Sequence, residues 1–164
     1  MELLISVAII SLLSSIALAS LSGVRQEAKI TGMAQNLKEI EKGLKLWMQD
    51  NNRTNWPQEY GTRLEDFINN YNIGSYLPKA PKPAFGSTRY TYQYAGDNFE
   101  CGSSNYYDGV VFYVRGVPKK IGKQLNEKVE DDTNSDGTQD LECGKFRRRP
   151  NGLINYQLSP DGSF

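Results

Sequence analysis

The chain has 164 residues, with 19 Lys or Arg and 19 Asp or Glu, so its formal net charge is zero. A balanced charge gives no indication of a nucleic-acid partner, and we predict no specific one. The sequence contains no histidine, which removes the commonest general base and the commonest zinc ligand. Its carboxylates come without a recognisable nucleophile or base, so we predict that the protein is not an enzyme.

The N-terminal third of the chain is predicted to form one long helix with two different surroundings. Residues 3–24 carry no charge, and their number matches the roughly 20 residues needed to cross a bilayer. From Arg25 onward, apolar residues recur at spacings of three and four, which is typical of an amphipathic helix. Charged residues, Glu41 among them, are expected on its other faces. The apolar stripe consists of Ile30, Met33, Ala34, Leu37, Ile40, Leu44, Trp47 and Met48.

Pro57 is the first proline in the sequence, and Asn51 and Asn52 are the expected end of this helix. A plain membrane anchor is the simplest interpretation of the uncharged run, but two features are not typical of one. Glu2 stands at the edge of the run, where burial of a lone charge is expensive. The run also continues without a linker into the amphipathic stripe.

Residues 2–13 (ELLISVAIISLL) resemble the N-terminus of type IV pilins and type II secretion pseudopilins, which starts with an acid, Leu-Leu and an apolar helix. The resemblance implies an α+β, pilin-like fold with the long helix packed on a small antiparallel sheet. It implies that Glu2 neutralises the N-terminal amine of a neighbouring subunit, a pairing that makes a buried carboxylate tolerable. The implied partners are copies of the chain and related pilin subunits in a helical filament.

The same resemblance implies a bacterial inner-membrane protein that passes into a periplasmic or extracellular filament. The sequence departs from the family at Ala19 and Ser11, where many pilins have Pro and Gly. It also lacks the family's basic leader, so we expect a fragment of a longer precursor. The alternative is a membrane-anchored, calcium-dependent adhesin or binding module that never polymerises.

Three parts follow from this interpretation. They are residues 1–24, the transmembrane or filament-core half of the helix; 25–52, its amphipathic half; and 53–164, a globular α+β domain.

Within the globular domain, a short helix is expected from a Thr62 cap to Asn69, with a loop over residues 71–86. The strands are expected at 89–94, 110–115 (central), 144–149 and 153–158, with a helix at 119–130.

The two cysteines, Cys101 and Cys143, both lie in the globular part. Behind an export anchor they are expected to form one disulfide, because exported compartments are oxidising. Closing a loop of about 40 residues stabilises by roughly 3–4 kcal/mol in the chain-entropy model. We therefore predict a Cys101–Cys143 disulfide.

The acidic run EDDTNSDGTQDLE at residues 130–142 has the spacing of a calcium-binding loop. Oxygen-bearing side chains at relative positions 1, 3, 5 and 9 wrap around a hard cation, and Gly137 at position 6 permits the sharp turn. The alternative is a solvated turn, since Asp, Asn and Gly favour turns in any case. The predicted Ca²⁺ ligands are Asp132, Asn134, Asp136, Asp140 and the Thr138 carbonyl, with Glu142 as an addition.

A basic triplet, Arg147, Arg148 and Arg149, follows this run. Contact with phosphate is one interpretation. We favour a solvated strand edge, partly neutralised by the acidic run.

Overall fold

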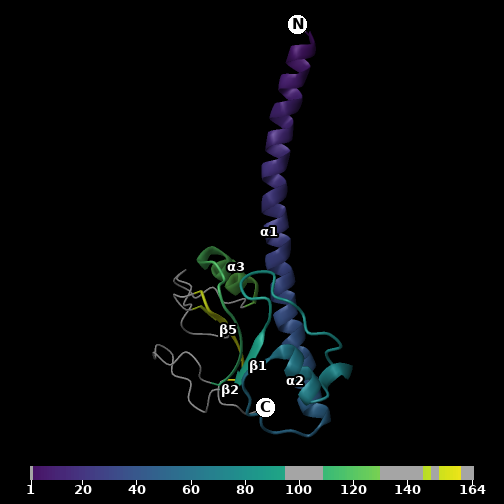
Figure 1. The fold of residues 1–164 in the computed structure, drawn as a ribbon, viewed down its shortest axis with the longest axis vertical. Coiled ribbons are helices and arrows are strands. Elements are labelled where there is room, and N and C mark those ends of the chain that lie inside the picture. The colour runs from purple at the N-terminus through teal and green to yellow at the C-terminus, as the bar shows by residue number, and fades with distance from the viewer. Residues whose placement is uncertain (1, 95–108, 130–145, 149–151, 160–164) are drawn as a thin grey trace.

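The computed structural model describes residues 2–94, 109–129, 146–148 and 152–159 of the chain. These residues form an α+β fold with one long helix beside a small antiparallel sheet, as the sequence predicts (Figure 1). The elements are α1 (Glu2–Asp50), β1 (Tyr60–Arg63), α2 (Leu64–Asn70), the short 3-10 helix η1 (Ile73–Ser75), β2 (Thr91–Tyr94), β3 (Val110–Val114), α3 (Lys119–Val129), β4 (Phe146–Arg148) and β5 (Ile154–Ser159).

The predicted apolar stripe of α1 is confirmed as the centre of the core. All eight of its residues are buried, and Ile30, Met33 and Ile40 are fully inaccessible. The helix ends at Asp50, and Asn52 has a left-handed backbone, which agrees with the expected stop. The hydrophobic core therefore forms between the C-terminal half of α1 and the elements that surround it.

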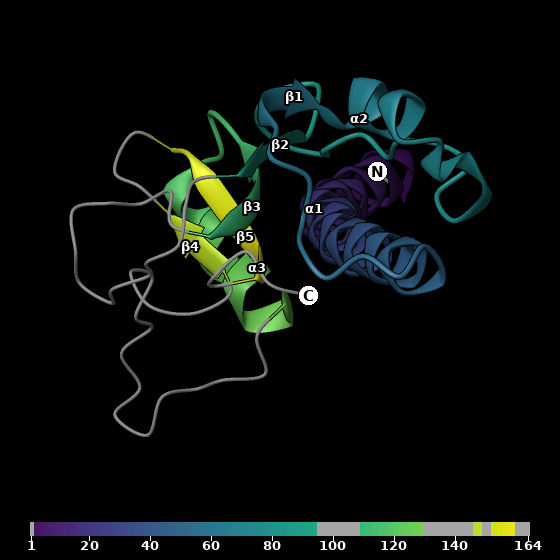
Figure 2. The same cartoon turned by 90° about the horizontal axis from the view of Figure 1, so that it is seen from below.

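The sheet has the strand order β1-β2-β3-β5-β4, with every neighbouring pair antiparallel (Figure 2). The central position predicted for the 110–115 segment is confirmed by β3. One row of directly opposed side chains faces the core, and all four members are buried: Tyr92, Phe112, Tyr156 and Phe146. The residues next to them in each strand point to the opposite face of the sheet, because side chains alternate along a strand.

The prediction that Thr62 caps the following helix is wrong. Thr62 lies in β1, a strand that the sequence analysis did not predict, and its hydroxyl donates to a Glu59 carboxylate oxygen at 2.8 Å. The residue that precedes α2 is Arg63, which has extended backbone angles and makes no capping hydrogen bond through its side chain. The predicted inward residues Leu64, Phe67 and Ile68 are all buried as expected.

An aromatic cluster fixes α2 against the sheet. The Phe67 ring stacks on Tyr92 with ring centroids 4.2 Å apart and lies 4.8 Å from Tyr71. The Tyr92 hydroxyl donates to the Pro57 carbonyl at 2.8 Å. Burial raises the pKa of the Tyr92 phenol well above its ordinary value, which favours the protonated form that donates this hydrogen bond.

Candidate functional site

The N-terminal half of α1 projects beyond the sheet and the other helices (Figure 1). At about 1.5 Å per residue, the 49 residues of α1 span about 74 Å. Large apolar side chains on this projecting half are 54–65% exposed: Ile5, Val7, Ile9, Ile10, Leu12 and Leu13. Contiguous exposed apolar surface of this kind marks an interaction site with a protein or a membrane. We call these six residues the apolar assembly face, after the role that we propose for them below.

Two serines on this half of α1 satisfy their hydroxyls within the helix itself. The Ser11 hydroxyl donates to the Val7 carbonyl at 2.8 Å, and the Ser15 hydroxyl donates to the Ser11 carbonyl at 2.9 Å. A hydroxyl that is paired with the preceding turn does not need water. The serines are therefore compatible with burial of the apolar assembly face in apolar surroundings.

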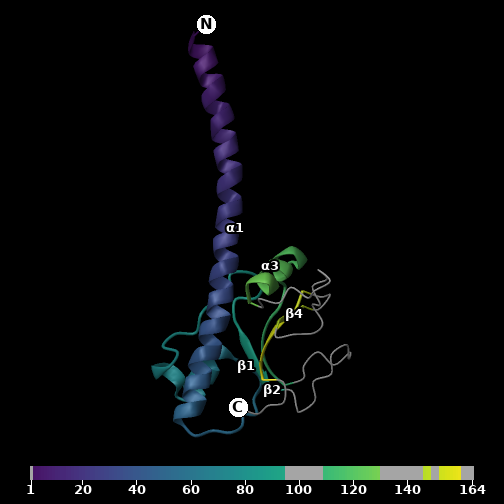
Figure 3. The ribbon, with the colours of Figure 1, turned by 180° about the vertical axis from the view of Figure 1, so that it is seen from behind.

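Helix α3 lies beside α1 where the projecting half begins (Figure 3). The Lys128 ammonium pairs with the Glu27 carboxylate at 2.6 Å, and the Lys38 ammonium donates to the Lys128 carbonyl at 3.1 Å. The Gln26 and Gln124 side-chain amides meet at 3.4 Å. These contacts fix the middle of α1 at the boundary between its exposed and its buried half.

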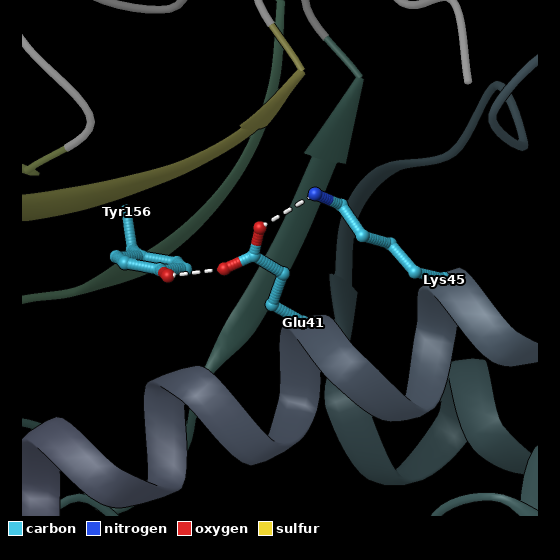
Figure 4. A network of polar contacts seen from close by, with 3 residues as sticks. All are labelled: Glu41, Lys45 and Tyr156. Atoms are coloured by element: carbon cyan, nitrogen blue, oxygen red, sulfur yellow. Dashed lines mark hydrogen bonds and ion pairs between the residues drawn. The ribbon is translucent and has the colours of Figure 1, made fainter.

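Glu41 anchors α1 to the sheet. The sequence pattern predicts Glu41 on a face away from the apolar stripe, and this is wrong, because only 8% of the residue is exposed. The Tyr156 hydroxyl, from β5, donates to one carboxylate oxygen, and Lys45 pairs with the other at 2.8 Å (Figure 4). A buried charge is tolerable with such partners.

The helical spacing contained a signal for this burial. Glu41 lies four residues after Leu37 and three before Leu44. Both neighbours belong to the buried stripe, so Glu41 shares their face.

The predicted site residues fall mainly outside the described part of the chain. Glu2 is the first residue of α1, and its side chain is not described. Arg147 and Arg148 lie in β4, at the edge of the sheet and within the strand predicted at 144–149, but the exposure of their side chains is not described. Outside the described residues lie Cys101, Cys143, Arg149 and all proposed calcium ligands: Asp132, Asn134, Asp136, Thr138, Asp140 and Glu142. The disulfide and the calcium site therefore remain predictions.

Among the described residues, no three His, Cys, Asp or Glu side chains come together in a metal-binding arrangement. Within the same residues, no helix combines the length and the apolar character needed to cross a membrane.

Comparison with protein-family models, with curated proteins and with solved structures found no match to this chain.

Proposed function

We propose that this protein is a structural subunit of a type IV pilus or a type II secretion pseudopilus, with a pilin-like fold. The observation that carries the proposal is one uninterrupted helix with two different halves. The C-terminal half is built into an α+β core, and the N-terminal half exposes the apolar assembly face. The acid and Leu-Leu sequence at residues 2–4 adds the family resemblance.

Assembly follows from the composition of the projecting half. Exposed apolar surface is driven out of water at about 25 cal/mol per Å². In the proposed filament, the same half of other copies or of related subunits covers it, and before assembly the inner membrane does. The alternative function, a membrane-anchored calcium-dependent adhesin, also buries this face in lipid but forms no filament.

The experiment that separates the two functions is filament formation by the chain behind a prepilin leader, in a host with a pilus assembly machinery. We expect filaments from the parent chain, and their loss in Leu12→Asp, because a charge among packed apolar helices is expensive. Leu12 is 65% exposed in the single chain, so its replacement leaves the described core intact.

Leu46→Asp is the matched control, since Leu46 is an exposed leucine on the other half of α1. It should assemble like the parent chain, and electron microscopy with measurement of the membrane-bound fraction reads out both variants. A parent chain that stays in the membrane and forms no filament supports the adhesin instead.

We further propose that the acidic run at residues 130–142 binds one calcium ion that stabilises the fold. The repelling carboxylates of Asp132, Asp136, Asp140 and Glu142 are neutralised by the ion, which binds the folded loop preferentially. Calcium in the micromolar to millimolar range should therefore raise the melting temperature of the full chain in neutral detergent. Asp132→Ala should remove this response, and an equal melting temperature in calcium and in chelator would refute the site.

A further inference from the structure

An open pocket of about 460 Å³ lies on the face of the sheet that points away from the core. Its floor includes Thr91 and Tyr113, which oppose each other on β2 and β3. Their sequence neighbours Tyr92 and Phe112 are buried in the core, so the alternation along each strand places Thr91 and Tyr113 on the other face. The volume is within the range of ligand pockets, about 300–1,000 Å³.

Three arginines from distant parts of the sequence line this pocket. Arg63 ends β1, Arg89 precedes β2, and Arg115 follows β3. None of the described residues that line the pocket is acidic. Ion pairs between described residues involve Lys45 and Lys128, and none of them reaches these three arginines. The guanidinium groups are permanently charged, so their shared pocket concentrates positive charge.

The backbone holds two of these arginines in place. Gly86 has a φ of +82° and packs so closely on the end of β3 that a Cβ would lie 2.3 Å from the Arg115 carbonyl oxygen. The Ser87 amide donates to that same oxygen at 2.7 Å. The Ser87 hydroxyl donates to the Arg89 carbonyl at 3.0 Å and accepts from the Arg115 amide at 3.4 Å. The segment that carries Arg89 is thereby locked to the one that carries Arg115.

The third arginine is positioned by a bulge in β1. The register of β1 against β2 shifts between Tyr60 and Thr62, and the intervening Gly61 has a φ of +68°. After this shift Arg63 lies opposite Thr91, beside the pocket floor. On the far side, the Arg115 guanidinium lies 5.6 Å from the centre of the Tyr113 ring, within the range of a cation–π contact.

We propose that this pocket is a binding site for a tetrahedral oxyanion, the phosphate or sulfate group of a ligand. The guanidinium groups of Arg63, Arg89 and Arg115 supply charge-assisted hydrogen bonds in the fork geometry that suits such oxygens. The hydroxyl of Thr91 is a further donor on the floor. The site is independent of filament assembly, because it lies on the sheet rather than on the apolar assembly face.

Isothermal titration of the full chain in neutral detergent tests the proposal. Inorganic phosphate and sodium sulfate are titrated separately, and sodium chloride at matched ionic strength serves as the reference. We expect saturable binding with one anion per chain for phosphate, for sulfate or for both, and none for chloride. The ratio of the two affinities identifies which oxyanion the pocket prefers.

Charge-removing variants locate the binding. Arg89→Gln and Arg115→Gln should each weaken the affinity by about tenfold or more, since each removes a charged, bidentate donor. Arg25→Gln removes the same charge from an exposed arginine on α1 and should leave the affinity unchanged. Thermal melting in chloride checks that each variant is folded, and Arg63→Gln replaces any variant that is not.

Two results would overturn the proposal. One is the absence of saturable binding for both oxyanions. The other is an equal loss of affinity in Arg25→Gln and in the pocket variants, which would indicate general charge attraction. Neither result bears on filament formation, so the proposal of an oxyanion site and the proposal of a filament subunit can fail separately.

Discussion

Glu2→Ala should abolish or sharply reduce incorporation into filaments while the globular part still folds. In the proposed filament, Glu2 meets the N-terminal amine of a neighbouring subunit in apolar surroundings, and removal of one partner leaves the other charge buried without compensation. Breaking a buried ion pair in this way costs about 3–5 kcal/mol at each contact. Since every subunit repeats the contact, the loss recurs along the whole filament. Electron microscopy of cells that express the variant behind a prepilin leader measures the effect.

Glu39→Ala is the matched control for this experiment. Glu39 is an exposed acid on the same helix, and it lies in the half that packs on the globular part. We expect filaments of normal number and length from this variant. Normal filaments from Glu2→Ala as well would show that the acid has no role in docking and would remove the main support for the pilin resemblance.

Phe67→Ala should lower the free energy of unfolding by about 3–5 kcal/mol, the usual cost of replacing a fully buried phenylalanine by alanine. Phe67 has no exposed surface, and its ring fills the space between Tyr71 and Tyr92. The variant loses both ring contacts and leaves a cavity between α2 and the sheet. Urea denaturation of the full chain in neutral detergent, followed by far-UV circular dichroism, measures the change.

Tyr60→Ala provides the comparison, because Tyr60 is an aromatic residue of the adjoining strand and is 78% exposed. Its replacement should change the free energy of unfolding by no more than about 0.5 kcal/mol, as for most surface substitutions. A loss below about 1 kcal/mol in Phe67→Ala would mean that the aromatic cluster repacks around the vacant space and does not hold α2 in position.

The elements predicted from the sequence are those whose pattern is local. The apolar stripe of α1 repeats over five turns, and the residues Ile121 and Leu125 of α3 follow the same period, so each helix could be recognised without its partner. The segment VVFYV is apolar throughout, as expected for a central strand. These signals depend on a few neighbouring residues, so they can be recognised without knowledge of the tertiary contacts.

The features that were missed depend on contacts between distant residues. Strand β1 has four residues, a bulge at Gly61 and mainly exposed side chains, so it has no apolar pattern of its own. It exists because β2 provides a pairing edge. The arginine pocket likewise joins residues 63, 89 and 115, which no spacing rule connects. The candidate assembly site could be predicted because it is an apolar run in the sequence. The predicted disulfide and calcium loop lie outside the described residues.

The continuity of α1 has a mechanical consequence. Each residue of an α-helix adds about 100° of rotation and 1.5 Å of rise, and α1 has no break at which this relation is lost. The number of residues between the apolar assembly face and the Glu27–Lys128 contact therefore sets the angle, measured around the helix axis, between that face and the sheet. One inserted residue there would swing the whole sheet by about 100° around the helix axis. A rotation of the projecting half about its own axis therefore turns the sheet in the same direction.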